Sequence, residues 1–326
     1  MTGAVRTSCH PPCKHAKRDN LPGDDNLGRR GFVNPLVIDN LPTLRQPVMI
    51  LAFAGWNDAG EAATSAAQLL CSRLNAEKFA YLDPEEFYNF AEHRPRVRLI
   101  RGQREITWPA NEFFYCRDDS LLRDLIIGVG IEPHLKWKTY VGAILDLARQ
   151  CQVSMVLTLG ALLAEVVYSR PIRITGSSTD PDLSARLHLS TSRYEGPTGI
   201  VGVLNDFCRR EGLPAVSLWA NVPHYLSNTP NPKAMHALVR RVLGVLDYPL
   251  DLHDVELAVQ DFESKVAEVI ANNPAVASYV RQLEEREADE EDDAPSRREP
   301  DLPSGDQLVQ ELEQFLRQQR RDKPPE

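Results

Sequence analysis

The sequence contains no cysteine framework and no long hydrophobic run, and both absences restrict the class of protein. Its six cysteines lie in unrelated segments, at Cys9, Cys13, Cys71, Cys116, Cys151 and Cys208. The most apolar stretch, Val153 to Tyr168, is too short to span a bilayer and carries Glu165. The first thirty residues lack an apolar signal core, so secretion is not expected. We therefore expect free thiols, a cytoplasmic location and no contact with a membrane.

An excess of positive charge is missing as well. The 326 residues carry a formal net charge of −9, with 42% hydrophobic and 25% charged side chains. A phosphate backbone requires a basic surface, so nucleic acid is not an expected partner. The composition instead predicts a globular protein with a real core.

Signatures of established catalytic and cofactor sites are also absent. The chain has neither a Gly-x-Ser-x-Gly nucleophile elbow nor a glycine-rich loop ending in Gly-Lys-Ser/Thr. Gly128 and Gly130 begin a dinucleotide-like pattern, but Pro133 follows where the helix and a third glycine belong. The segment from Cys9 to His15 holds four metal-binding side chains but no second pair to close a site. The sequence predicts no cofactor and no metal, and it favours a protein that is not an enzyme.

Apolar strands alternate with amphipathic helices along the middle of the chain. The predicted strands are 48–54, 125–129, 153–159 and 215–220, and the predicted helices are 61–74, 136–150, 199–210 and 235–246. Residues 97–117 differ, because their apolar pattern around Gly102 predicts short antiparallel strands that flank a turn. The alternation predicts an α/β fold, a three-layer α/β/α sandwich around a mixed, mainly parallel sheet, followed by C-terminal helices.

Shifts in composition divide the chain into five parts. The predicted parts are a disordered tail at 1–34, an α/β domain at 35–250, a helical extension packed on it at 251–286, an acidic, proline-containing linker at 287–303 and an amphipathic tail helix at 304–326. The linker is predicted because eight acids fall within residues 284–293 and because proline and arginine follow them. The first tail is predicted because it lacks apolar periodicity.

The last of these parts carries one apolar stripe. Its members, at helical spacing, are Leu308, Leu312, Phe315 and Leu316. We expect this stripe to bind a protein partner, because such a surface favours burial against another molecule. The alternative is that the helix folds back onto its own core.

Three segments together resemble the PAC2 family (proteasome assembly chaperone 2-like), in its actinobacterial branch. They read LAFAGWNDAG at 51–60, YEGPTGIVG at 194–202 and SLWANVPHY at 217–225. The resemblance covers roughly residues 35–286, and the segments occur in the family's order. It implies a fold like that of nucleoside phosphorylases, assembled as a homo-oligomer such as a trimer, with protein partners that the sequence does not name.

The same resemblance carries an expectation about proteasomes. Eukaryotic and archaeal relatives help to assemble them, and some archaeal members end in a hydrophobic–tyrosine–any-residue tail that docks into proteasome pockets. This chain ends in Lys323, Pro324, Pro325 and Glu326. Docking by that route is therefore not expected.

Polar side chains follow the predicted strands, at the edge where parallel strands end. Ligands of open parallel sheets bind in the crevice beyond this edge. The candidate ligand-binding side chains are Asn57, Asp58, Glu132, His134, Glu165, Tyr194, Thr198, Asn221 and His224. If these acids, amides and histidines converge, they form a pocket for a small polar ligand.

Helix capping explains several of these side chains without a ligand. Asp58 and Glu61 fit a capping box at the start of a helix. Thr198 is placed to cap the helix that begins at Gly199. The free backbone donors before that helix also suit an anion, although no basic side chain accompanies them. His134 and His224 fit simple loop histidines.

Two hypotheses about function remain. The first is a non-catalytic interaction or assembly factor, chaperone-like, with an oligomeric α/β core. The alternative is an enzyme or binder of a small polar, nucleoside-like ligand, with Asp58, Glu132 and Glu165 as acid or base. The enzyme requires the three carboxylates to surround one pocket. A structural role for Asp58 and divergence of the other two favour the assembly factor.

Overall fold

A computed structural model of the chain describes residues 34–118, 122–189, 194–227 and 229–292. By compactness the chain divides into Met1–Asn34 and Pro35–Glu326, and the account below concerns the second unit. The predicted tails lie outside the described residues, and with them the stripe of Leu308, Leu312, Phe315 and Leu316.

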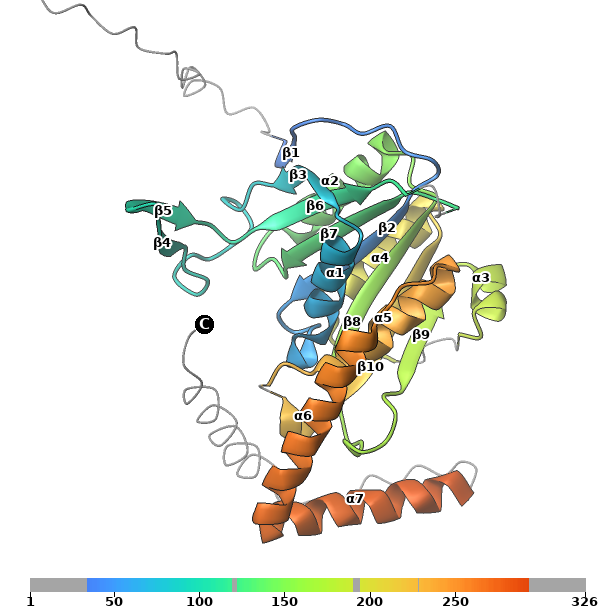
Figure 1. Cartoon of the computed structure of the whole chain (residues 1–326). Coiled ribbons are helices and arrows are strands. Elements are labelled where there is room, and N and C mark those ends of the chain that lie inside the picture. Colours follow the sequence, from blue (N-terminus) through green and yellow to red (C-terminus); the bar gives the residue numbers. More distant parts are fainter. Residues whose placement is uncertain (1–33, 119–121, 190–193, 228, 293–326) are drawn as a thin grey trace, which may run out of the picture. The chain divides into compact units, whose positions relative to one another are not determined.

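An eight-stranded mixed sheet forms the centre of this unit, in the order β1-β3-β6-β7-β2-β8-β10-β9 (Figure 1). The strands are β1 (Leu36–Ile38), β2 (Val48–Ala54), β3 (Glu77–Leu82), β6 (Asn111–Cys116), β7 (Leu125–Ile131), β8 (Met155–Ala164), β9 (Ile174–Ser178) and β10 (Ala215–Pro223). The four central strands, β7, β2, β8 and β10, are parallel, whereas the outer pairings are antiparallel. Parallel strands are buried on both faces, which explains why β2 reads as one apolar run.

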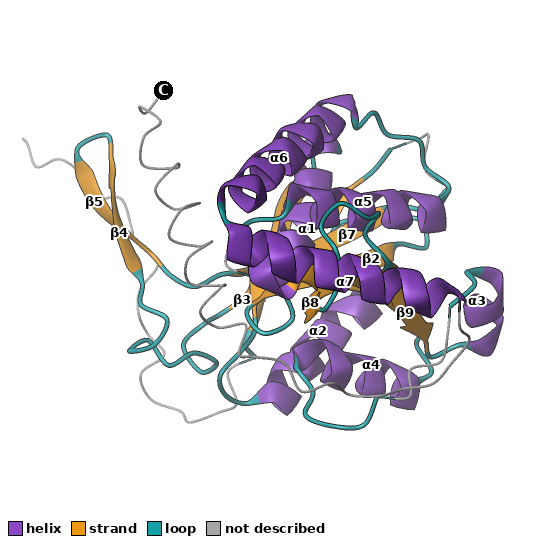
Figure 2. Ribbon diagram, turned by 90° about the horizontal axis from the view of Figure 1, so that it is seen from below, coloured by secondary structure: helices purple, strands orange, loops and turns teal. Residues whose placement is uncertain are grey.

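Helices cover the two faces of this sheet (Figure 2). The helices of the described residues are η1 (Ala59–Glu61), α1 (Ala62–Arg73), α2 (Trp137–Gln150), α3 (Pro181–Arg186), α4 (Ile200–Glu211), η2 (His224–Leu226), α5 (Pro232–Leu246), α6 (His253–Asn272) and α7 (Pro274–Asp292). Helices α1 and α5 pack on one face, and α2 and α4 pack on the other. The predicted three-layer α/β/α sandwich with a mixed sheet is confirmed.

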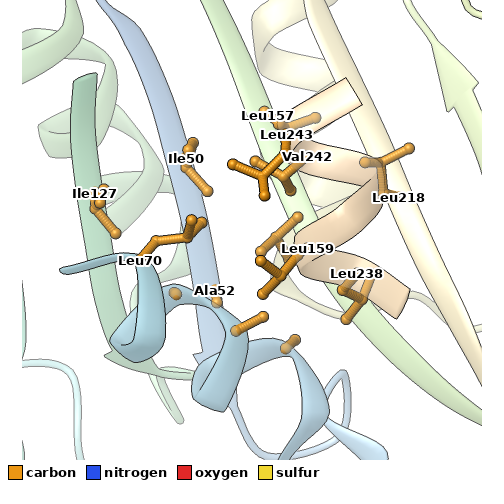
Figure 3. Close-up of a cluster of buried hydrophobic side chains, with 14 of the residues drawn as sticks. Ile50, Ala52, Leu70, Ile127, Leu157, Leu159, Leu218, Leu238, Val242 and Leu243 are labelled. Atoms are coloured by element: carbon orange, nitrogen blue, oxygen red, sulfur yellow. The ribbon is translucent and has the colours of Figure 1, made fainter. Parts of the chain in front are cut away.

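Small residues bring α1 close to the sheet. Its inner face presents Ala63, Ala66 and Ala67, each fully buried, beside Leu70. Alanine keeps the helix near β2 and β8, so Leu70 reaches Ile50 in the core (Figure 3). Burying a leucine of this kind contributes about 2 kcal/mol to stability.

Helix α7 begins immediately after α6 and continues further than the sequence suggested. Val276, Val280 and Leu283 of α7 are buried with Tyr225, which lies in η2. The acidic segment from Glu287 was predicted to be a linker, but the helix extends to Asp292. Glutamate, alanine and arginine are strong helix formers, so the helix continues into the acidic segment.

The segment between β8 and α4 also differs from the prediction. It was expected to be irregular, yet it contains β9 and α3. Strand β8 extends to Ala164, beyond its predicted end at Leu159, because it pairs with β10 as far as Pro223. Strand β9 then pairs antiparallel with the outer side of β10.

Candidate functional site

Asp58 lies after β2 and caps α1. Its Oδ1 accepts hydrogen bonds from the backbone N–H groups of Ala63 at 2.7 Å and Thr64 at 3.2 Å, while the Thr64 hydroxyl donates to Oδ2. Burial raises the pKa of this carboxyl above its ordinary value, against the lowering effect of these donors. The side chain is therefore engaged by its own helix.

The predicted capping box does not form in detail. A turn of 3-10 helix, η1, separates Asp58 from α1, so Asp58 reaches the helix across that turn. Glu61 has the left-handed backbone conformation, with φ of 52°, and makes no side-chain cap. The capping role of Asp58 holds, whereas the reciprocal role of Glu61 was wrong.

Glu132 follows β7 and joins two other segments. Its Oε1 accepts hydrogen bonds from Asn57 Nδ2 and from the backbone N–H of Ile200, both at 2.8 Å. Ile200 is the first residue of α4, so Glu132 caps that helix from a distant part of the chain. A carboxylate is favourable there because the amino end of a helix is positive.

The predicted cap by Thr198 does not form. Thr198 is exposed, and its hydroxyl donates only weakly to the Gly199 carbonyl, at 3.5 Å. A Cβ at position 199 would lie 2.4 Å from Asn57 Oδ1, so glycine is needed for this close approach. Because the negative carboxylate of Glu132 already lies at this helix end, the arrangement disfavours an anion.

A buried polar network lies beside Glu132, and no pattern in the sequence predicts it. Asn111 Oδ1 accepts hydrogen bonds from the Ile131 backbone N–H at 2.8 Å and from the Tyr140 hydroxyl at 2.7 Å. Asn111 Nδ2 donates to the Tyr88 hydroxyl, which donates to the Ile131 carbonyl at 2.6 Å. Burial raises the pKa of Tyr88 to about 12 and that of Tyr140 well above its ordinary value.

The same network explains the pair of glycines that resembled a nucleotide loop. Gly128 and Gly130 lie within β7. A Cβ at Gly130 would lie 2.0 Å from Asn111 Oδ1, and one at Gly128 would lie 2.4 Å from a Leu51 methyl carbon. These glycines make room for neighbouring side chains inside the sheet.

The remaining predicted residues lie apart from this cluster. Exposed Glu165 is near Arg286 of α7, with 3.9 Å between Oε2 and Nη1. His224 Nε2 is 3.0 Å from the Tyr279 hydroxyl, also on α7. Half-buried Asn221, at the end of β10, has an Oδ1 that contacts no donor within the described residues.

Two exposed loop residues complete the predicted set. His134 accepts a hydrogen bond at Nδ1 from the Asn89 backbone N–H at 3.0 Å. Tyr194 donates its hydroxyl hydrogen to the Pro197 carbonyl at 2.9 Å.

The three candidate carboxylates therefore diverge. Asp58 points to α1 on one face of the sheet, and Glu132 points to α4 on the other. Glu165 faces α7 instead. The described residues bring Asn57 and Glu132 together, but they do not surround one pocket with all three acids.

A second candidate surface is the β-hairpin of β4 (Arg96–Ile100) and β5 (Gln103–Thr107), called the hairpin below. It forms its own two-stranded sheet and projects beyond the edge of the central sheet in both views (Figures 1 and 2). Its turn has positive φ at Arg101 (51°) and Gly102 (81°), which is the geometry of a tight hairpin turn with two central residues. The predicted antiparallel strands around Gly102 are confirmed.

The hairpin has one apolar face. Val97 pairs with Ile106 and Leu99 with Arg104, so these four side chains share one side. The exposed fractions of the apolar residues, with Trp108 just beyond β5, are 63% for Val97, 73% for Leu99, 59% for Ile106 and 47% for Trp108. Exposed apolar clusters of this kind mark interaction sites.

Charge and anchoring set the hairpin apart from the rest of the chain. Within 94–108 the charged residues are Arg94, Arg96, Arg98, Arg101, Arg104 and Glu105, in a chain of net charge −9. Trp108 packs edge-on against Phe90, with ring centroids 5.0 Å apart, and holds the base of the hairpin.

Beside the hairpin, part of the sheet has an open face. On the α1 side, β3, β6 and β7 present half-buried Tyr81, Glu112, Phe114 and Val129; we call these four residues the open half-face. A cavity of about 570 Å³ lies between α1 and this face, and a second of about 510 Å³ lies toward the hairpin base. Ala110 and Glu112 line both, so the two cavities adjoin.

Among the described residues, no group of three or more His, Cys, Asp or Glu side chains is placed to hold a metal ion. None of the helices within the described ranges is long and apolar enough to cross a membrane.

The fold and these surfaces define an α/β/α sandwich protein in which the carboxylates of Asp58 and Glu132, at two strand ends, are bonded to the chain's own helices. The chain belongs to the PAC2 family, because the model of that family matches residues 52–270. This confirms the resemblance seen in the sequence.

Solved structures of relatives agree with this membership. A PAC2 family protein from Streptomyces avermitilis is 41% identical, covers 72% of this chain and 99% of its own, and has a TM-score of 0.68. A proteasome-assembly chaperone homologue from Mycobacterium tuberculosis is 39% identical, covers 72% and 99%, and has a TM-score of 0.66. Both organisms are actinobacteria, as the resemblance implied.

A more distant relative shares the fold alone. It is an archaeal proteasome activator from Pyrococcus furiosus, 22% identical, which covers 72% of this chain and 97% of its own with a TM-score of 0.59. No protein with curated function matches the chain.

Proposed function

We propose that the protein is a non-catalytic assembly factor, which works through contacts with other proteins from an oligomeric α/β core. The observation that carries this proposal is the divergence of Asp58, Glu132 and Glu165. An acid or base needs a carboxylate free to meet a ligand, whereas two of these are occupied as helix caps. The geometry gives no support to the enzyme hypothesis.

The hairpin supplies the surface for such contacts. It exposes Val97, Leu99 and Ile106 on a rooted, two-stranded element. Aromatic residues and arginine are enriched at protein interfaces, and Trp108 and five arginines lie within residues 94–108. A role in binding other proteins accounts for the exposure of these apolar side chains, whereas an enzyme that binds its substrate in a pocket would not require it.

The relatives suggest the kind of complex that is assembled. One is described as a proteasome-assembly chaperone homologue and another as a proteasome activator. We propose that this chain acts on a proteasome through the exposed apolar face of the hairpin. A homo-oligomer such as a trimer would present several hairpins to the ring-shaped target at once.

The test is assembly from purified parts. Proteasome α and β subunits from the cell that makes this chain are mixed with and without it, and complete particles are followed on native gels. We expect at least a severalfold faster rate or higher yield at equimolar protein. An unchanged rate and yield would contradict the assembly role.

A matched variant separates this role from catalysis. Glu132→Gln keeps an oxygen that accepts from Asn57 and Ile200, so we expect the fold and the assembly effect to persist. If Glu132→Gln abolishes the effect while the melting temperature stays the same, the carboxylate has a chemical role and the proposal fails.

A further inference from the structure

We propose that the apolar stripe of the C-terminal segment docks on the open half-face of its own copy and completes the helical layer there. The stripe consists of Leu308, Leu312, Phe315 and Leu316, and the open half-face of Tyr81, Glu112, Phe114 and Val129. The proposal selects the alternative that the sequence left open, in which the predicted tail helix folds back onto the core. It goes beyond the proposed assembly role and does not depend on it.

The open half-face is left by the placement of α1. This helix packs on β2, β7 and β8, so its layer stops short of β6 and β3 (Figure 1). Phe114 pairs with Ile127, a member of the core cluster beneath α1, so Phe114 faces the α1 side. On the opposite face the same strands are covered, with Phe79 and Phe113 buried. Within the described residues, one face of β3 and β6 therefore lacks the helical layer of an α/β/α sandwich.

The hollow beside this face has room for a helix. The cavity of about 570 Å³ lies between α1 and β6, with Cys71 and Phe114 on its two sides, and the cavity of about 510 Å³ continues it. The stripe from Leu308 to Leu316 covers about 13 Å of a helix. Strand β7 has seven residues and is about 23 Å long, so the stripe fits within the length of the sheet.

The charges of the two surfaces match as well. Among the residues that line the cavity beside α1, Glu112 alone is charged, which suits an apolar stripe. The adjoining cavity has three acids against one base, namely Asp83, Glu85 and Glu112 against Lys78. Three arginines follow the stripe, namely Arg317, Arg320 and Arg321. Opposite charges beside an apolar contact fix its orientation and speed its formation.

The connection along the chain favours this occupant over an unrelated protein. Residues 293–303 join the end of α7, at Asp292, to the segment that carries the stripe. Eleven residues span at most about 36–40 Å when fully extended. A compact unit of this size has a radius of gyration of about 18 Å, so the segment can reach surfaces well beyond α7 on the same copy. A tether of this kind gives an effective concentration in the millimolar range.

The experiment places a photo-crosslinking residue, p-benzoylphenylalanine, at position 315 of the full chain. Isotopically light and heavy chains are refolded together from urea, so that any oligomer contains both, and the linked peptides are sequenced after irradiation. We expect cross-links within one copy that attach to β6 or to the part of α1 around Cys71. The same probe at position 310, on the opposite face of the predicted helix, should give no such link.

A second measurement uses Cys71 as a reporter of docking. This half-buried thiol lines the cavity beside α1, so a docked stripe should shield it from iodoacetamide. Labelling is run at about pH 9, because burial raises the pKa of Cys71 to about 12 and the thiolate is the reacting form. Phe315→Asp should raise the labelling rate of Cys71 at least about fivefold.

Two controls accompany this measurement. Gln310→Asp makes the same kind of change on the opposite face of the predicted helix and should keep the wild-type rate. Cys208, fully buried in α4, should stay unlabelled in both variants, which shows that the core remains folded.

Three outcomes overturn the proposal. The first is cross-links from position 315 that join light to heavy copies, which would place the stripe on a second copy. The second is cross-links within one copy that avoid both β6 and α1. The third is a labelling rate of Cys71 that is the same for Phe315→Asp and the wild type. If position 315 links to another protein in the cell and leaves its own β6 unlinked, the stripe binds a partner and the proposal fails.

Discussion

At the carboxyl edge of the sheet the polar side chains are hydrogen-bonded within the chain, whereas on the hairpin the apolar side chains are left exposed. At the edge, Asp58, Glu132 and Asn111 make their hydrogen bonds to the chain itself. On the hairpin, Leu99 and Ile106 remain exposed. The comparison teaches that a cluster of polar residues is evidence for a site only when its groups are left unused by the fold.

The same comparison predicts different consequences of mutation. Removing a group that is satisfied internally should lower the free energy of unfolding, because its partners lose their bonds in a buried place. Removing an exposed apolar group should leave that free energy unchanged and alter contacts with other molecules. The predictions below run from the largest expected effect on stability to the smallest.

Asn111→Ala should have the largest effect. It leaves the Ile131 N–H and the Tyr140 hydroxyl without their acceptor, and the Tyr88 hydroxyl loses one donor while it keeps its bond to the Ile131 carbonyl. Buried unsatisfied groups cost about 1–3 kcal/mol each, so we expect a loss of about 4 kcal/mol in urea unfolding. Tyr140→Phe removes one of these bonds and should cost about 1 kcal/mol. Equal losses for the two variants would contradict the network.

Asp58→Ala should have an intermediate effect. It removes the cap on the Ala63 and Thr64 backbone donors, which typically costs about 1–2 kcal/mol. Thermal and urea melts of the variant measure it. A variant that melts like the wild type while losing a bound ligand would reverse the interpretation.

The contribution of Asp58 should also depend on pH. Its folded pKa is raised by burial above the ordinary 3.8, so the folded state holds the proton more tightly than the unfolded state. The stability gained from this tighter proton binding is fully present below pH 3.8 and is lost as pH rises through the folded pKa. Urea unfolding of the wild type and of Asp58→Asn, from acid to neutral pH, measures this dependence. If the free energy of unfolding of the wild type rises relative to that of the variant as the pH rises, the predicted sign is wrong.

Leu99→Ser should have the smallest effect on stability. The side chain is 73% exposed, and surface substitutions of this type change the free energy of unfolding by less than about 0.5 kcal/mol. A loss above 1 kcal/mol, judged against Leu257→Ser, would place Leu99 in a packed core.

Local sequence patterns predicted most of the fold. The apolar run of β2 and the helical spacing of α2 and α4 placed these elements within about two residues, because burial on one or two faces imposes a period that is visible in sequence. Short edge elements were missed. Strand β9 has a mixed burial pattern, and its pairing with β10 depends on tertiary contact.

The site was predictable only where its contacts are local. The bond from Asp58 to Ala63 spans five residues, and the capping role of Asp58 was expected. The bond from Glu132 to Ile200 spans 68 residues, so no pattern in sequence foretold that a distant carboxylate would replace Thr198 as the cap. The open half-face was invisible for the same reason, because it depends on which strands α1 fails to cover.

The most direct test is to measure the yield of assembled proteasome particles and the melting temperature together for Leu99→Asp and Asp58→Ala. The account predicts opposite results: Leu99→Asp lowers the yield at an unchanged melting temperature, and Asp58→Ala lowers the melting temperature while the folded protein keeps the wild-type yield. If Leu99→Asp instead melts early with its effect on the yield intact, the hairpin is part of the stable fold and the account is contradicted.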